Sequence, residues 1–189
     1  MLATAFSVFL LQPRPFACYT FPRWQSALVI TLIGVLMGLD PGWRAVPPDA
    51  PPGMAVPPLW AAVGISMVLI WLGFLVVLGV LRWWLKRGQR WDGQGDLFNL
   101  VAASWLVVDV LGTGLVALGV PLLWTLPLWL YSVFVGAKAL SAGVPKASVG
   151  YSLGGIVSSI IVVIIVSSLV MGFAGFAMAV LSGVPPVAR

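Results

Sequence analysis

Residues 97–140 read LFNLVAASWLVVDVLGTGLVALGVPLLWTLPLWLYSVFVGAKAL, and most of them are apolar. A transmembrane helix needs about 20 apolar residues to cross a hydrocarbon core about 30 Å thick, so this stretch has room for two. Only Gly119-Val-Pro121 lies between the two apolar runs, and proline fits the first turn of a helix because its missing N–H leaves no bond unmade there. The stretch therefore predicts a tight hairpin of two membrane-spanning helices, over 97–120 and 121–140.

Three further apolar segments lie outside this hairpin. They cover 24–39, 59–81 and 149–181, and the last is long enough to tilt or kink within a bilayer. The composition agrees, because 61% of the 189 residues are hydrophobic, only 8% are charged, and the mean hydropathy is +1.09. A soluble domain carries about 25% charged residues. The sequence therefore predicts a single all-α transmembrane domain over residues 1–189, with five spans.

Lysine and arginine are distributed unequally between the two ends of these spans. Because basic residues are concentrated in cytoplasmic loops, the side with more of them is expected to be cytoplasmic. The opposite side carries only Arg44 and Arg189. We therefore expect a cytoplasmic N-terminus and an outer C-terminus, in a membrane of the bacterial cytoplasmic (inner) type. The eight residues on the cytoplasmic side are Arg14, Arg23, Arg82, Lys86, Arg87, Arg90, Lys138 and Lys146.

Two segments outside the spans have distinctive compositions. Residues 1–16 are predicted to form a short amphipathic helix at the membrane interface, with Phe6, Phe9 and Leu10 toward the lipid. The outer loop 41–58 contains seven prolines, which favour extended polyproline II and prevent a regular helix. We interpret this loop as a stiff cap on the outer face, with a recognition loop as the alternative.

Basic and aromatic residues are concentrated directly after the second span. One interpretation is a positive stop with an aromatic belt at the membrane interface. The other is a docking patch for lipid headgroups or a protein partner, because each basic residue near an anionic leaflet adds about 1 kcal/mol. The patch is short and pressed against the bilayer, so nucleic acid is not an expected partner. Its residues are Arg82, Trp83, Trp84, Lys86, Arg87 and Arg90.

Two GxxxG pairs occur in the predicted spans. Gly34 and Gly38 lie in the first span, and Gly150 and Gly154 open the fifth. Small residues at this spacing let two helix backbones approach closely within a membrane. We expect most of this packing to be internal to the bundle, with self-association or contact with other membrane proteins as the alternative.

Asp109 is the one acidic residue that falls within a predicted span. It follows Leu97 by 12 residues, or about 18 Å along a helix, which places it just past the midplane. An aspartate at such depth costs several kcal/mol, so it is expected to face the bundle interior, water or a partner. Thr113 and the serines of the fifth span are its expected neighbours, whereas Lys138 lies too near the cytoplasmic face. Its role is open between a hydrogen-bonded structural acid, a proton or solute pathway, and contact with another subunit.

The composition excludes several kinds of catalytic and metal site. The chain has no histidine, no glutamate and one cysteine, Cys18, so zinc sites, histidine-based triads and internal disulfides are not expected. Gly93-Gln-Gly-Asp96 matches the GxGD string of intramembrane aspartyl proteases, which need a second aspartate facing the first. Asp109 is about 20 Å further along the same helix. We instead predict Asp96 as the N-cap of the third span, and no enzyme activity, cofactor or metal.

Several strings, taken together, resemble the prokaryotic branch of the Yip family, named for Rab/Ypt-interacting proteins. They are Leu11-Gln-Pro13 before the first span, the Gly/Asp loop and helix start over 91–104, the segment 126–140, and the polar turn 141–146. The resemblance covers roughly residues 8–175. It implies five helices, a cytoplasmic N-terminus and a non-enzymatic role in organising membranes or partners. The Asp-Leu-Tyr-Gly-Pro motif of the eukaryotic members is absent, so Rab binding is not implied.

These observations lead to two expectations for function. The first is a non-enzymatic membrane protein that acts as a scaffold, adaptor or accessory subunit, with membrane lipids and other membrane proteins as partners. The alternative is a small ion, proton or solute transporter component that uses Asp109 within the membrane. Co-purifying proteins would favour the first, and flux by the isolated chain would favour the second.

Overall fold

The computed structural model describes residues 1–44 and 58–181, and within these ranges every regular element is a helix. The predicted proline-rich loop lies mostly outside the described residues. The elements are α1 (Leu2–Phe9), the short 3-10 helix η1 (Phe16–Tyr19), α2 (Arg23–Gly38), the short 3-10 helix η2 (Pro41–Arg44), α3 (Leu59–Arg87), α4 (Leu97–Ala117), α5 (Leu122–Gly143) and α6 (Val149–Leu181).

Four of these helices are long and apolar enough to cross a membrane: α3, α4, α5 and the described part of α6, Val149–Phe173. The apolar helix α2 has 16 residues and is about 24 Å long, shorter than a hydrocarbon core of about 30 Å. The prediction of an all-α membrane protein is confirmed at this level. Each of the five apolar segments read from the sequence is a helix.

The helix boundaries differ from the predicted spans at two places. α3 continues beyond residue 81 to Arg87, so the basic and aromatic segment is the last part of this helix. α4 ends at Ala117, and the hairpin turn contains Gly119 at φ 92°, a left-handed conformation that glycine adopts without steric cost. Pro121 directly precedes α5 as its N-cap residue, one position before the first helical turn in which the sequence placed it.

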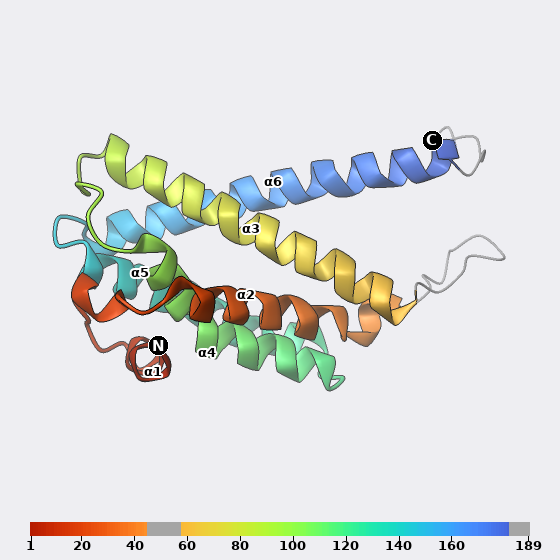
Figure 1. Ribbon diagram of the computed structural model, residues 1–189, viewed down its shortest axis with the longest axis horizontal. Coiled ribbons are helices and arrows are strands. Elements are labelled where there is room, and N and C mark those ends of the chain that lie inside the picture. The colour runs from red at the N-terminus through yellow and green to blue at the C-terminus, as the bar shows by residue number, and fades with distance from the viewer. Residues whose placement is uncertain (45–57, 182–189) are drawn as a thin grey trace.

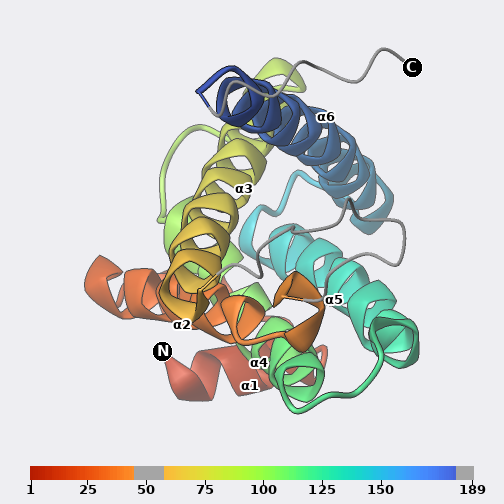
Figure 2. The same ribbon diagram turned by 90° about the vertical axis from the view of Figure 1, so that its right-hand side faces the viewer.

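The five longer helices form a ring. In order around it, α2 contacts α3, α3 contacts α6, α6 contacts α5, α5 contacts α4, and α4 returns to α2. Figure 2 views the bundle along its long axis and shows α6 opposite α4, with α3 and α5 on the two sides of the ring. The short helix α1 packs outside the ring against α4 and lies across the long axis of the bundle (Figures 1 and 2).

Helices that follow one another along the chain, from α2 to α6, run in opposite directions, whereas α4 and α2, which meet in the ring, run the same way (Figure 1). Figure 1 shows the N-terminus, the α3–α4 connection and the α5–α6 connection at one end, which we call the N-terminal end. The turn between α4 and α5 and the end of α2 lie at the other, which we call the hairpin end. Helices that are consecutive in the chain therefore alternate in direction, as successive crossings of a membrane would.

A buried asparagine fixes the N-terminal segment to the ring. The Asn99 side-chain N–H group donates to the carbonyls of Tyr19 (2.9 Å) and Phe21 (2.6 Å), and its amide oxygen accepts from the Ser26 hydroxyl (2.8 Å). Asp96 accepts from the Asn99 backbone N–H, which confirms the predicted N-cap, and pairs with Arg23 at 2.9 Å. These bonds join η1, α2 and α4.

The N-terminal segment contains a helix, α1, which is shorter than predicted, and only part of its predicted lipid face is exposed. Phe6 and Leu10 are exposed, whereas Phe9 packs edge-on against the ring of Tyr131 in α5. The Tyr131 hydroxyl also donates to the Phe9 carbonyl. Phe9 therefore anchors α1 to the ring instead of facing lipid.

Candidate functional site

A cleft of about 670 Å³ runs inside the ring, and all five longer helices contribute to its wall. Most lining side chains are aliphatic or aromatic. The polar ones come from the end of α2 and from α4, α5 and α6. They are Asp40, Ser104, Asp109, Thr113, Thr125, Ser132 and Ser167.

The cleft is closed toward the N-terminal end. Leu81, Leu100 and Leu140 line its deep end, and each is at most 2% exposed. At the hairpin end the lining includes Leu122, which is 69% exposed. The three leucines come from α3, α4 and α5, so they separate the cleft from the N-terminal end of the ring.

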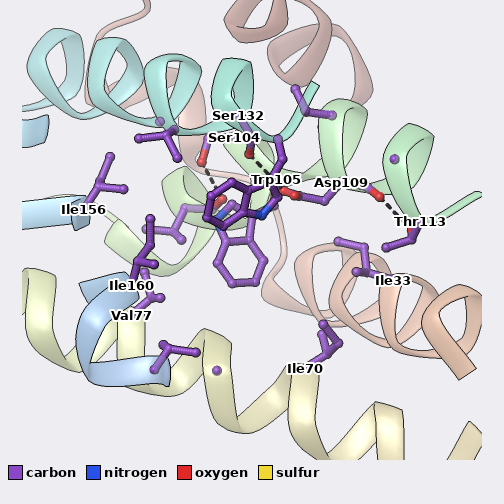
Figure 3. A pocket seen from close by; sticks show the side chains of 18 of the residues that line it. Ile33, Ile70, Val77, Ser104, Trp105, Asp109, Thr113, Ser132, Ile156 and Ile160 are labelled. Atoms are coloured by element: carbon purple, nitrogen blue, oxygen red, sulfur yellow. Dashed lines mark hydrogen bonds between the residues drawn. The ribbon is translucent and has the colours of Figure 1, made fainter. Parts of the chain in front are cut away.

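Asp109 lies in the wall of this cleft, as Figure 3 shows. Its carboxylate accepts a hydrogen bond from the Ser132 hydroxyl of α5, with 3.3 Å between the oxygens. The Thr113 hydroxyl donates to the Asp109 backbone carbonyl at 2.6 Å. The prediction that Asp109 faces the bundle interior therefore agrees with the structure. Thr113 is a neighbour of Asp109 as predicted, although it bonds to the backbone carbonyl. The expected serine was wrong, because the bonded serine is on α5 instead of α6.

Sequence reasoning overlooked Ser132, although the hairpin contains the signal for it. Asp109 precedes Val120 by 11 residues and Ser132 follows it by 12. In a tight antiparallel hairpin, residues at nearly equal distances from the turn lie at nearly the same depth. Applied to the predicted turn, this count would have placed Ser132 opposite Asp109.

The charged residues of the cleft are acidic. Asp40 and Asp109 line it, and its described lining contains no lysine or arginine. Asp40 lies just beyond α2 and accepts from the Gly42 backbone N–H at 2.8 Å. Lys138, which the sequence placed at a different depth from Asp109, is exposed and lies 5.8 Å from the centre of the Phe134 ring. The described wall of the cleft therefore holds two carboxyl groups and no basic side chain.

Two tryptophans, Trp105 and Trp129, also line the cleft. Figure 3 shows Trp105 beside Ser104 and Asp109, with the aliphatic side chains of α3 and α6 around it. The edge of the Trp105 ring packs against Phe74 of α3, with 5.4 Å between ring centres. Phe74 is fully buried and also contacts the Phe98 ring at 5.0 Å. This aromatic cluster holds Trp105 in place.

The two predicted glycine pairs occupy different settings. A Cβ atom at Gly38 would lie 2.5 Å from the Val63 Cα, and one at Gly34 would lie 2.8 Å from the Met67 Cα. These glycines therefore lie where α2 crosses α3 at close range. A Cβ at Gly154 would make ordinary contact with Trp84 at 3.5 Å.

Gly150 lies away from any helix contact. A Cβ added there would meet nothing within 4 Å. The tight glycine of this helix is instead Gly155, where a Cβ would lie 2.9 Å from Trp84. The sequence pattern therefore pointed to the right helix but to the wrong glycine.

The predicted basic and aromatic patch is divided by the structure. Trp84 turns toward α6, where its ring N–H donates to the Tyr151 carbonyl at 3.3 Å. Arg90 donates to the Lys146 carbonyl at 2.8 Å. Arg90 is also exposed but lies beyond the end of α3. The exposed members within α3 lie at positions i, i+1, i+4 and i+5 and share one face of the helix. They are Arg82, Trp83, Lys86 and Arg87, and the Arg87 guanidinium lies 5.2 Å from the centre of the Trp83 ring.

No family model matches the chain, and no curated protein or solved structure matches it. The resemblance to the Yip family therefore stays a prediction.

Proposed function

We propose that the protein is an integral membrane protein with five spans, of which α2 is the first. The reversal of direction between successive helices supports this topology (Figure 1). The eight basic residues expected on the cytoplasmic side lie in or beside the elements of the N-terminal end. By the positive-inside rule, the N-terminal end faces the cytoplasm and the hairpin end faces outward, in a membrane of the bacterial cytoplasmic type.

We further propose that the protein is a non-enzymatic transporter component that moves a small cation, a proton or a cationic solute. The observation that carries this proposal is the position of Asp109. Its carboxyl lies in a cleft formed by all five helices of the ring, and its one described side-chain partner is a neutral hydroxyl. Acidic residues within membrane spans are costly and are typical of ion and proton pathways.

The closed end of the cleft defines what movement transport would require. Leu81, Leu100 and Leu140 are buried between Asp109 and the N-terminal end. A cation that reached Asp109 from outside would pass to the cytoplasm only when these leucines separate. In this proposal the structure corresponds to the outward-open state, and transport alternates between it and an inward-open state.

The test is flux through the purified chain in liposomes. A pH gradient with a trapped pH-sensitive dye reports proton flux, and radiolabelled organic cations report solute flux. Asp109→Asn is expected to abolish the flux, and Asp92→Asn is the matched control because Asp92 is exposed in the α3–α4 connection. Equal flux through both variants, or none through the unaltered chain, would contradict the proposal.

The exposed face of α3 supports a second candidate function, that of a scaffold, adaptor or accessory subunit. Arg82, Trp83, Lys86 and Arg87 present three positive charges and an aromatic ring together at the N-terminal end. Such a face suits anionic lipid headgroups or an acidic region of another membrane protein. Purification in a mild detergent, followed by mass spectrometry, tests this candidate. A stoichiometric partner that is lost when the three basic residues become glutamine would support it, and a chain that arrives alone would contradict it.

A further inference from the structure

The chemistry of the cleft wall identifies a class of ligand. The wall has a charged side and an apolar side. Asp109, Ser132 and Ser104 belong to α4 and α5. The contributions of α3 and α6 near them are aliphatic and include Ile70, Val77, Ile156 and Ile160, which Figure 3 shows around the cavity.

We propose that this cleft binds an apolar organic monocation, with its positive charge at Asp109 and its apolar groups against α3 and α6. This inference rests on the proposed transport function and specifies its substrate. The ligand class includes quaternary ammonium and phosphonium ions and protonated amines that carry aromatic or alkyl groups.

Charge complementarity is the first argument. The described lining contains two ionisable side chains, Asp109 from α4 and Asp40 beyond α2, and both are acidic. The described lining residues of α3, α5 and α6 include no titratable side chain. A cation is the ligand that such a wall favours, and an anion would meet repulsion without any basic group to offset it.

The scarcity of polar groups argues against a bare inorganic cation. A dehydrated metal ion such as Ca²⁺ needs six to eight oxygen ligands, whereas the region of Asp109 offers one carboxylate and a few hydroxyls. Isoleucine and valine side chains offer no ligands that would compensate such an ion for the loss of its hydration shell. An organic cation carries its own apolar shell, so the same side chains stabilise it.

The size and aromatic content of the cleft agree with this ligand. A volume of about 670 Å³ lies within the range of about 300–1,000 Å³ that is typical of sites for drug-sized molecules. Trp105 and Trp129 line the wall, and tryptophan is the best aromatic partner for organic cations. The Trp105 ring lies beside Asp109 (Figure 3), so carboxylate and ring can contact the same ligand.

Competition by protons is a direct consequence. A protonated Asp109 has no charge to offer, so binding of the organic cation is expected to weaken as the pH falls. Asp40 at the rim is the other titratable group of the described lining, and Asp40→Asn separates its contribution from that of Asp109.

The experiment measures binding of radiolabelled tetraphenylphosphonium to the purified full-length chain in detergent, by equilibrium dialysis. We expect saturable binding, at least tenfold weaker for Asp109→Asn and about threefold weaker for Ser132→Ala. Asp92→Asn is expected to bind as tightly as the unaltered chain. The neutral analogue triphenylphosphine oxide should compete poorly.

The pH dependence tests the inference without any substitution. Saturable binding that weakens at low pH would support the inference. Binding that is absent, or that is equally tight at every pH and in Asp109→Asn, would overturn it. Binding without flux in liposomes would contradict the proposed transport function and leave this site assignment standing. Proton flux that depends on Asp109 but occurs without phosphonium binding would overturn the assignment and leave transport standing.

Discussion

Replacement of Asn99 by alanine is expected to release the N-terminal segment from the ring. The side chain is fully buried and makes three hydrogen bonds, to the carbonyls of Tyr19 and Phe21 and from the Ser26 hydroxyl. Alanine makes none of them. The Ser26 hydroxyl can turn to a carbonyl of its own helix, so the two carbonyls determine the cost.

The size of the effect follows from the burial of these two groups. A buried polar group that loses its partner costs about 1–3 kcal/mol. Tyr19 is fully buried, whereas Phe21 is half-buried and its carbonyl is nearer to water. We therefore expect the segment to lose about 2–4 kcal/mol of local stability, which raises its detached population about 30- to 700-fold because 1.4 kcal/mol is a factor of ten.

Hydrogen exchange of residues 1–22, measured by mass spectrometry in detergent, reports this population directly. Faster exchange in Asn99→Ala, confined to this segment, is the expected result. Gln94→Ala is the matched control, because it also removes a side-chain amide but from an exposed residue. Unchanged exchange in Asn99→Ala, or equal acceleration in both variants, would refute the argument that Asn99 holds the segment.

Two further predictions concern packing and pH. Gly38→Ala is expected to lower the unfolding free energy in detergent by about 1–3 kcal/mol, because its Cβ would lie 2.5 Å from the Val63 backbone. Gly150→Ala should cost nothing, because a Cβ at that position has free space. Equal effects of the two substitutions in SDS titrations would contradict the close α2–α3 contact. The pKa of Tyr19 is raised to about 12, mainly because the side chain is buried, and its hydroxyl has no described hydrogen-bond partner. The unfolded chain loses this proton near pH 10, so the stability that the protonated form provides should decline as the pH rises from about 10 toward 12. Tyr19→Phe should remove this decline and stabilise the segment slightly at pH 7, and a decline that persists in that variant would show that another group is responsible.

The positions of the longer helices could be predicted from the sequence, because each is a long apolar run with glycine or proline near its ends. The hairpin turn over 118–121 is an example, since Gly119 adopts a left-handed conformation and Pro121 directly precedes α5, where its missing N–H leaves no helical bond unmade. The inward position of Asp109 was also predictable, because a carboxyl in a span is too costly to face lipid.

The side-chain partners were harder to predict, because they depend on how the helices are rotated and which ones are neighbours. Asn99 has no special sequence context, yet it joins three elements. Trp84 belongs to an aromatic cluster that is typical of the membrane interface, but the arrangement of α3 against α6 turns it inward. Gly150 has the same spacing pattern as Gly34, and only the observed packing shows that Gly155 is the close one.

The most direct test of the central claim is the accessibility of Ser132, the partner of Asp109, to a charged thiol reagent. The chain has one cysteine, Cys18, so a Ser132→Cys substitution in a Cys18→Ser background gives a single reactive site. A cationic, membrane-impermeant methanethiosulfonate reagent is applied from either side of sealed vesicles. Ser152→Cys is the unreactive control, because Ser152 is fully buried outside the cleft.

An outward-open cleft with negative charge predicts rapid reaction from the outside, faster for the cationic reagent than for an anionic one. It also predicts protection by tetraphenylphosphonium. No reaction from either side, reaction only from the cytoplasm, or equal rates for both reagents would contradict the account.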